Sequence, residues 1–441
     1  MADSGTGAFG KIGGWEVAGI VALLVAVIGL GVATEIHSAF LKRRQTDLDT
    51  YLRAAWAVRT GGNMYSITDT NGWHYNYPPL LGILLVPLAD APRALEQHNW
   101  VPFSVSVGLW YVLSVVLAWI GTDRLARALE KTSGDAEVRL QRRYCRRWWA
   151  LRLLPLLICL PALARALARG QVNSLLLLLL ALTGASLAYR RYVRAGLWTG
   201  LAAAVKVFPL FLGLYWLWRW SWRGLLGVLL GLVVGGVLVP VVTMGPQGTW
   251  AAYGHFAHVV IAPALGLNHN ASRDVELFDV NHTDSNSYEA IINHMLHPGH
   301  NPPMPSRAVK VMHWLISLAL VAATLLVERR SRVDHPLHRN LFFGCLIAVL
   351  LPMIPICHPH YFCLTLPLVV TLMAVRWERD QKLPFGWPLL AVLWFVFAAH
   401  IITVLPHARY FRNFGLVTFA DLALWGAGIY WMANFRRRVL A

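Results

Sequence analysis

The sequence predicts an all-α polytopic membrane protein, and three observations support this fold class. Hydrophobic residues make up 57% of the 441-residue chain and charged residues only 14%, whereas about 25% of the residues of a soluble protein are charged. Apolar runs of about 20 residues recur along the chain, and each can cross a hydrocarbon core of about 30 Å as a helix. Lysine and arginine are concentrated in alternate loops between these runs, as the positive-inside rule requires.

Ten apolar runs are interpreted as full transmembrane helices. They cover residues 15–39, 100–122, 149–167, 172–189, 222–243, 308–328, 340–357, 361–376, 386–404 and 415–434. The basic residues place both termini in the cytoplasm, so we expect a multi-pass protein of the cytoplasmic (inner) membrane. The formal charge of +17 is attributed to cytoplasmic loops rather than to nucleic-acid binding. The five cysteines form no CxxC pair, and neither a disulfide scaffold nor a zinc site is predicted from them.

The segment 195–219 differs from the other apolar stretches. Arginines flank it on both sides, and its 25 residues are too few to cross the membrane twice at 1.5 Å per residue. Pro209 removes a backbone donor and favours a break. We therefore expect a broken, re-entrant helix pair, which is tolerated where it lines a cavity in the protein. Lys206 would lie about 18 Å into the membrane, where a lysine is a functional candidate. The alternative is a lysine that extends to the surface.

The first outer loop, residues 40–99, carries the strongest indication of chemistry. Asp47 and Asp49 follow the first span, within a loop rich in tyrosine, tryptophan, glycine and proline. Two residues apart on a helix, the two carboxylates point to different sides, so one active carboxylate is favoured over a catalytic pair. The apolar stretch 80–89 is too short to span the membrane and predicts a juxtamembrane helix.

Further polar residues lie on the predicted outer side. Gln171 and Asn173 stand in a tight turn between two spans, where they can hydrogen-bond a sugar or simply belong to a hairpin. The long outer loop 246–307 contains seven histidines and five acidic residues, but their spacing matches no known zinc pattern. His358 and His360 fall at the outer end of a span, where a histidine is costly unless it is used or satisfied.

Several of these motifs, taken in order, resemble glycosyltransferase family 87. The first outer loop contains Asp47-Leu48-x-x-Tyr51, Gly61-Gly62-Asn63-x-Tyr65 and Tyr75-Asn76-Tyr77-Pro78-Pro79-Leu80. Gly170-Gln171-x-Asn173, Gly200-Leu201-Ala202-Ala203-Ala204-x-Lys206-x-x-Pro209, Asn286-Ser287 and His360-Tyr361 follow in the family's order. The resemblance covers residues 45–375, although Asn63-Met64 stands where an aspartate-proline is usual. Members of family 87 are membrane enzymes of the GT-C superfamily that use polyprenyl-phosphate sugars, typified by mycobacterial mannosyltransferases of phosphatidylinositol mannosides.

The resemblance implies one domain, residues 1–441, with a GT-C-type fold. It also implies an inverting glycosyltransferase on the outer face, which moves a sugar, mannose in the best-known case, from a polyprenyl-phosphate donor to a lipid or glycan acceptor. Asp47 aligns with the family's catalytic aspartate and is the expected general base, with Asp49 as the fallback. The residues expected to bind the donor phosphate or sugar are Lys206, His360, His358, Arg43, Arg44, Gln171, Asn173, Asn286 and Tyr51.

No metal or other cofactor is expected, because inversion from a phosphate donor needs one general base and no metal. The expected partners are membrane lipids, the polyprenyl-phosphate sugar and the lipid or glycan acceptor, with no nucleic acid. A different class of protein remains an alternative: a lipid transporter or flippase would use Lys206 and the broken helix as a site near the bilayer midplane. A scaffold for envelope assembly, the third option, would leave Asp47 dispensable.

Overall fold

The structure is a computed structural model of the chain. It describes residues 14–42, 44–134, 139, 146–265, 267, 271–279, 285–297, 304–380 and 386–439. Within these ranges the ordered elements are helices, and the sole pairing of extended residues is an isolated bridge between Thr68 and His74. The all-α fold class predicted from the sequence is confirmed.

Seven helices of the described chain are long and apolar enough to cross a membrane. They are α1 with η1 (Gly14–Glu35 and Ile36–Leu41), α4 (Phe103–Lys131), the helix Trp222–Ala264, α16 (Arg307–Ser331), α17 (Pro336–Met353), η7 with α18 (Pro359–Thr365 and Leu366–Asp380) and α21 (Leu416–Ala433). The pair α6 (Arg146–Ile158) and α7 (Leu160–Arg169) is bent by 60° and counts as an eighth span. Two shorter apolar helices, α8 (Asn173–Ala188) and α19 (Trp387–Ile402), match the remaining two predicted spans. The chain is therefore a polytopic membrane protein.

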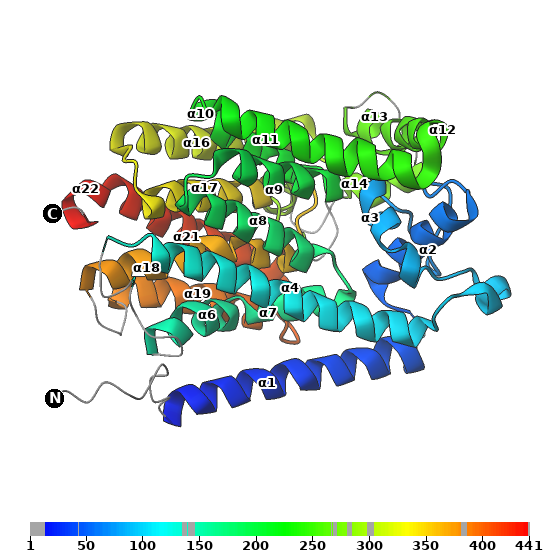
Figure 1. The fold of residues 1–441 in the computed structure, drawn as a ribbon, viewed down its shortest axis with the longest axis horizontal. Coiled ribbons are helices and arrows are strands. Elements are labelled where there is room, and N and C mark those ends of the chain that lie inside the picture. The colour runs from blue at the N-terminus through cyan, green and yellow to red at the C-terminus, as the bar shows by residue number, and fades with distance from the viewer. Residues whose placement is uncertain are drawn as a thin grey trace, which may run out of the picture.

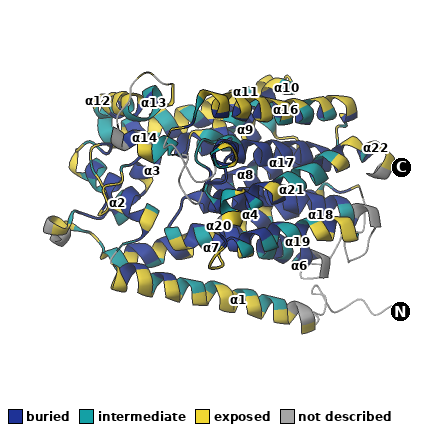
Figure 2. Cartoon of the chain, turned by 180° about the vertical axis from the view of Figure 1, so that it is seen from behind, coloured by how far each residue is buried: buried dark blue, intermediate teal, exposed yellow. Residues whose placement is uncertain are grey.

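The helices run lengthwise through the molecule, which gives it two distinct ends (Figure 1). One end carries the short helices α2 (Thr46–Thr60) and α3 (Pro79–Leu84) and is called the Asp47 end here. The opposite end, where α1 begins and α22 (Phe435–Val439) lies, is called the Glu328 end. Helices α17 and α8 form a buried centre, whereas α1 lies along the edge of the bundle with most of its side chains exposed (Figure 2).

The segment 192–218 is a broken hairpin. Helix α9 (Tyr192–Val205) ends at Lys206, whose backbone is extended, and the chain continues as η4 (Phe208–Leu212) and α10 (Gly213–Trp218). Both ends of the hairpin meet the same stretch of chain: Arg190 pairs with Asp334 at 2.6 Å, and the carbonyl of Trp218 accepts a hydrogen bond from Arg332. The hairpin therefore starts and finishes at the Glu328 end, which confirms the predicted re-entrant arrangement.

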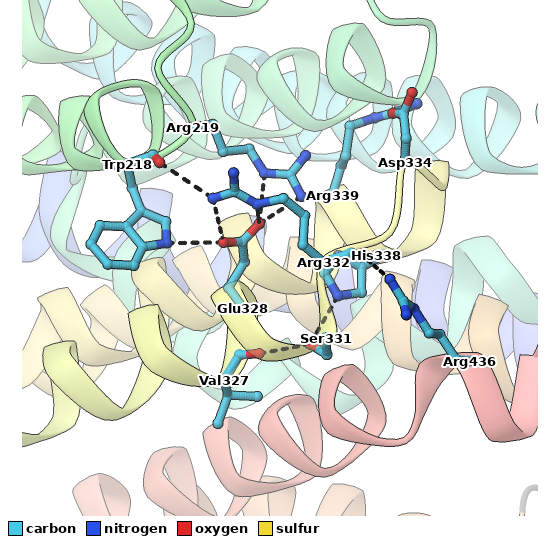
Figure 3. Close-up of polar contacts among 10 residues, drawn as sticks. All are labelled: Trp218, Arg219, Val327, Glu328, Ser331, Arg332, Asp334, His338, Arg339 and Arg436. Carbon is cyan, nitrogen blue, oxygen red and sulfur yellow. Dashed lines mark hydrogen bonds and ion pairs between the residues drawn. The ribbon is translucent and has the colours of Figure 1, made fainter.

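A buried carboxylate, Glu328 of α16, fixes the returning end of this hairpin (Figure 3). Its Oε1 accepts hydrogen bonds of 2.8 and 3.0 Å from the guanidinium of Arg219, and both of its oxygens accept from Arg332 at 2.9 Å. The indole of Trp218 donates to Oε2 at 2.9 Å. Because a buried charge is stable only when it is paired and hydrogen-bonded, this cluster holds α10 firmly against α16.

Glycines bring α9 into direct contact with α11 (Trp222–Val233). A Cβ added at Gly200 would overlap the carbonyl oxygen of Val228, and one added at Gly231 would overlap that of Leu197. Gly196 and Gly227 complete two small-xxx-small pairs, one on each helix, a pattern that lets helix backbones approach closely in membranes. This packing sets the position of the C-terminus of α9 and hence of Lys206.

The Asp47 end is built from two loop regions that contact each other. The first contains α2, α3, η2 (Val86–Leu88) and η3 (Arg93–His98), and α3 with η2 occupies the predicted juxtamembrane stretch. The second follows the helix Trp222–Ala264, which comprises α11, η5 (Val234–Leu238), α12 (Val239–Phe256), η6 (Ala257–Ile261) and α13 (Ala262–Ala264). It contains α14 (Ala271–Phe278) and α15 (Tyr288–Leu296), and α20 (Arg409–Asn413) contacts α15. The predicted long loop over 246–307 therefore starts inside a helix.

Helix α14 is attached to the first loop region by charged side chains. Glu276 accepts hydrogen bonds from the Nδ2 of Asn76 at 2.7 Å and contacts the Nδ1 of His74 at 2.7 Å. Arg273 donates to the side chain of Asn76 and to the carbonyl of Tyr65. The two loop regions, some 200 residues apart in sequence, are thus joined by this α14 contact.

Candidate active site

Polar side chains from five separate stretches of sequence meet at the Asp47 end. They are Asp47, Tyr51, Tyr77, Arg169, Gln171, Lys206, His360 and Tyr361, and are called the Asp47 cluster. The elements that supply them are α2, the segment before α3, the turn between α7 and α8, the break after α9, and η7.

Asp47 lies in the first turn of α2, where the positive end of the helix dipole favours a carboxylate. Its Oδ2 accepts a hydrogen bond of 2.8 Å from the Nε of Arg169, the last residue of α7. Both side chains remain partly exposed, 21% for Asp47 and 29% for Arg169. Asp47 is therefore held by a cation and is still accessible to a ligand.

The α7–α8 turn is fixed directly against α2. Gly170 ends α7 with a φ of 69°, and a Cβ at this position would lie 2.6 Å from the side chain of Leu48. Glycine is required here by the backbone angle and by the close approach of α2. Gln45 donates from Nε2 to the carbonyls of Leu167 and Ala168 at 3.1 Å, which holds the end of α7 beside the start of α2.

Two tyrosines and a glutamine form a hydrogen-bonded group beside Asp47. The hydroxyl of Tyr51 lies 3.1 Å from the hydroxyl of Tyr77 and 3.1 Å from the Oε1 of Gln171. Burial, together with the nearby Asp47 carboxylate, raises the pKa of Tyr77 to about 12. Burial also raises the pKa of Tyr51 well above its usual value. Both hydroxyls therefore stay protonated and able to donate hydrogen bonds at neutral pH.

Lys206 extends into the cluster from the break after α9. Its side chain is buried, and its Nζ donates to the hydroxyl of Tyr361 at 2.9 Å. The ammonium also lies 4.0 Å from the ring centroid of Tyr361 and 4.8 Å from that of Tyr77, within the range of cation–π attraction. Asp47 and Lys206 interact electrostatically across the cluster. The alternative of a lysine extended to the surface does not hold.

Basic groups surround His360 of η7. Arg165, Arg169, Lys206 and His358 all lie close enough to interact with it electrostatically. The rings of His358 and His360 stack with their centroids 5.2 Å apart. The Nε2 of His360 is buried and makes no hydrogen bond within the described chain. Basic side chains therefore surround His360, and two of them, Arg169 and Lys206, also interact with Asp47.

Asp49 occupies a different environment from Asp47. It is buried, its Oδ2 accepts a hydrogen bond of 2.8 Å from the hydroxyl of Thr70, and its Oδ1 lies 3.5 Å from the Nε of Arg53. Burial raises the pKa of Asp49, an effect that Thr70 and Arg53 oppose. Its bonds join α2 to the rest of the first loop region, and the predicted separation of the two carboxylates to different sides of the helix is observed.

The remaining predicted residues take varied positions. Asn173 donates to the carbonyl of His360 at 3.0 Å. The backbone of Asn286 donates to the carbonyl of Cys357, next to His358, and Asn286 is buried. Arg44 bonds to the side chain of Asn71 in the first loop region. Arg43 lies outside the described residues.

A metal centre built from the histidines of the long loop is not found among the residues that the structure describes. In the described ranges, no group of three or more histidine, cysteine, aspartate or glutamate side chains is arranged to hold a metal ion. His269, His282 and His300 lie outside those ranges.

Arg169, Tyr77 and Tyr361 belong to the cluster but were not among the predicted site residues. Arg169 directly precedes the Gly170-Gln171 motif, and Tyr361 directly follows His360. The sequence signal that could have identified Arg169 is its position directly before the glycine of this motif. Tyr77 was indistinguishable from the aromatic side chains that line membrane interfaces.

The fold and the cluster together define a polytopic membrane protein with a partly exposed carboxylate beside several basic side chains. The sequence profile described as glycosyltransferase family 87 matches residues 75–353, more than half of the chain. The chain therefore belongs to glycosyltransferase family 87, as its motifs indicated.

Among solved structures, the chain is similar to ArnT from Cupriavidus metallidurans, both bound to undecaprenyl phosphate and in the apo state. In each case the sequence identity is 14%, the alignment covers 94% of this chain and 77% of that chain, and the TM-score is 0.43. No curated protein sequence matches the chain. The assignment rests on the family match.

Proposed function

We propose that this glycosyltransferase moves mannose from a polyprenyl-phosphate donor to a hydroxyl of a lipid or glycan acceptor, with inversion at the anomeric carbon. The observation that carries the proposal is the Asp47 cluster, in which one accessible carboxylate stands beside an excess of positive charge. Family membership limits the reaction to glycosyl transfer. The cluster supports the choice of donor.

The charges of the cluster suit a phosphate-linked donor. Arg165 and Arg169 carry positive charges beside His360, and Lys206 adds a third when it is protonated. The acid that interacts with Arg169 and Lys206 is Asp47. Buried charges require partners, so an anionic ligand would balance the excess. Cations around a departing phosphate also stabilise the charge that develops as the glycosidic bond breaks. We assign Lys206, His360, His358 and Arg169 to the donor phosphate.

Asp47 is the proposed general base. Inversion in a single displacement needs one base that takes the proton of the acceptor hydroxyl. Asp47 is partly exposed and faces the cations, whereas Asp49 is buried and bonded to Thr70 and Arg53. Asp49 is therefore proposed to support the loop rather than to react. Tyr51, Gln171, Asn173 and Asn286 are proposed to position the sugar.

We further propose that the protein lies in the inner membrane with both termini in the cytoplasm and the Asp47 end outside. The distribution of lysine and arginine between loops supports this orientation. A lipid flippase is less well supported, because Lys206 bonds to Tyr361 and interacts electrostatically with Asp47, so it belongs to the same cluster as the accessible carboxylate. No metal or other cofactor enters the proposal.

The experiment compares Asp47→Asn with Asp49→Asn in nanodiscs, using radiolabelled polyprenyl-phosphate mannose and a cell lipid extract as acceptor. We expect Asp47→Asn to lower transfer by about 10³-fold, within the range of general-base contributions. Asp49→Asn keeps a partner for Thr70 and is expected to retain activity within about tenfold.

Two results would contradict the proposal. Full transfer by Asp47→Asn would rule out Asp47 as the base. Absence of transfer by the wild-type protein from any polyprenyl-phosphate sugar would rule out the donor class. Size-exclusion profiles of the purified variants separate loss of chemistry from loss of folding.

A further inference from the structure

Arg169 occupies a position between the proposed base and the proposed phosphate site. Its Nε donates to Asp47, and its charge also acts on His360 and Tyr361. A guanidinium presents five N–H donors in a planar fork and binds carboxylates and phosphates by the same geometry. Arg169 is therefore able to bind either partner.

The charges of these two partners change in opposite directions during the proposed reaction. The acceptor oxygen forms a bond to the anomeric carbon, and the bond from that carbon to the phosphate oxygen breaks, with its electron pair left on the phosphate. The acceptor proton passes to Asp47. Asp47 thus goes from −1 to 0, while the phosphate goes from −1 in the diester to −2 in the monoester.

We infer that Arg169 transfers its hydrogen bonds from Asp47 to the departing phosphate as the base takes up the proton. This inference rests on the proposed function and adds a catalytic role for a residue outside the family motifs. Before the reaction, the Asp47 carboxylate holds the guanidinium of Arg169. After the reaction, the neutral carboxyl group of Asp47 attracts the guanidinium far less than the phosphate dianion does. Proton capture and departure of the leaving group are thereby coupled through one side chain.

The other basic groups of the site are less suited to this exchange. Lys206 is buried and donates to the hydroxyl of Tyr361. Arg165 donates to the hydroxyl of Thr403 and to the carbonyl of His400, both at the C-terminal end of α19. Arg169 is the one that is bonded to Asp47 and partly exposed. The geometry therefore assigns the exchange to Arg169.

A double-mutant cycle on ligand binding tests the inference without measuring transfer. The ligand is farnesyl phosphate, a monoester that is mostly dianionic at pH 8 because its second pKa is about 6. Asp47→Asn imitates the protonated base. It is measured alone, with Arg169→Gln and with Arg169→Lys, by calorimetry on protein in nanodiscs. Arg307→Gln removes an exposed arginine at the start of α16 and is the control for charge.

We expect Asp47→Asn to increase the affinity for farnesyl phosphate about tenfold when Arg169 is present. In a protein that also carries Arg169→Gln, Asp47→Asn should increase this affinity less than about threefold. Groups that interact show such non-additive effects. An equal effect of Asp47→Asn in both backgrounds would overturn the inference. If Arg169→Gln does not fold, the cycle with Arg169→Lys tests the inference instead, because lysine keeps the charge but lacks the planar fork. The effect of Asp47→Asn on binding should then be at least threefold smaller beside Arg169→Lys than beside Arg169.

The methyl ester of farnesyl phosphate, which carries a single charge, supplies a second readout. We compare the affinity for the monoester with the affinity for the methyl ester in each protein. This ratio should be about tenfold larger in the wild-type protein than in Arg169→Gln, because the cation that the variant lacks acts most on the dianion. In transfer assays, Arg169→Gln should lower kcat about 100-fold and change the KM of the donor less than tenfold. Failure of the donor class would show as no transfer by wild type, whereas failure of this inference would show as additive binding effects.

Discussion

Tyr51 illustrates how single hydroxyls organise the site at the residue scale. Its hydroxyl bridges the side chains of Tyr77 and Gln171, three groups that come from α2, from the segment before α3 and from the α7–α8 turn. Because buried polar groups are costly when unpaired, this bridge holds the three segments in register around Asp47.

Replacement of Tyr51 by phenylalanine removes that bridge while keeping the ring. We expect about a tenfold loss of transfer rate with little change in thermal stability, since the ring still packs against Tyr75 and Tyr77 and one neutral hydrogen bond contributes about 1 kcal/mol. Tyr111→Phe removes a comparable hydrogen bond, to the carbonyl of Val27, away from the cluster. Equal losses in the two variants would show that Tyr51 has no specific role at the site.

Residue spacing predicted part of this site. Asp47 and Asp49 differ in environment as their two-residue spacing on a helix requires, and Lys206 lies in the break that Pro209 indicates. Arg169 was not predicted, because its contact with Asp47 joins residues 122 positions apart. The end of α7 meets the start of α2 through Gly170, and helical periodicity within either segment carries no information on that contact.

At the scale of elements, the hairpin 192–218 depends on glycine contacts between α9 and α11. A side chain at Gly200 would meet the backbone of α11 at Val228 and Gly231. Backbone cannot move aside as a flexible side chain can, so the helices would have to separate. Lys206, at the end of α9, would then move relative to Tyr361.

Gly200→Ala is therefore expected to reduce both stability and activity. Overpacking of this kind costs about 1–3 kcal/mol, which should appear as a fall of several degrees in the melting temperature in nanodiscs. Gly213→Ala, in the same hairpin, is the matched control because a Cβ there meets no atom within 4 Å. A Gly200→Ala protein as stable as Gly213→Ala would show that the close packing of α9 and α11 is not required.

Helix boundaries were predicted well where the length of an apolar run determines them. At Gly245-Pro246 the prediction was poor, because a loop was expected to start there and the structure has helix. This dipeptide indicates a loop, yet helix continues on both sides of it. Gly245 takes a φ of 74°, which bends the chain, and Pro246 then starts the next helical stretch, where proline is tolerated. Local sequence marks the bend but not the resumption of helix, and α12 packs against α3 of the first loop region, a contact that the local sequence does not reveal.

At the scale of the whole molecule, the α14 contact joins loop regions that are distant in sequence. Glu276 binds His74 and Asn76, so the second loop region is held over the first. Sequence alone gave no sign of this contact, because its residues resemble solvated charges on a loop.

Glu276→Ala should release α14 without disturbing the bundle. Loss of these hydrogen bonds, worth about 1 kcal/mol or more each, is expected to speed amide exchange in α14 at least tenfold, because local opening then costs less. Exchange in the buried helix α17 should not change. Val275→Ala alters an exposed residue of the same helix and should leave exchange in α14 as it is in wild type; matching rates in the two variants would refute a role for Glu276.

The re-entrant hairpin also decides on which side of the membrane the later parts of the chain emerge. Between Asp47 and His360 the chain passes through α4, the α6–α7 pair, α8, the helix Trp222–Ala264, α16 and α17, an even number of crossings. Asp47 and His360 can share one site only if the intervening hairpin adds no further crossing. A straightened α9–α10 would add one, make the count odd and invert every loop that follows. The extended backbone at Lys206 thus preserves the parity of the topology, and the site can be assembled from both halves of the chain because this one helix does not run straight.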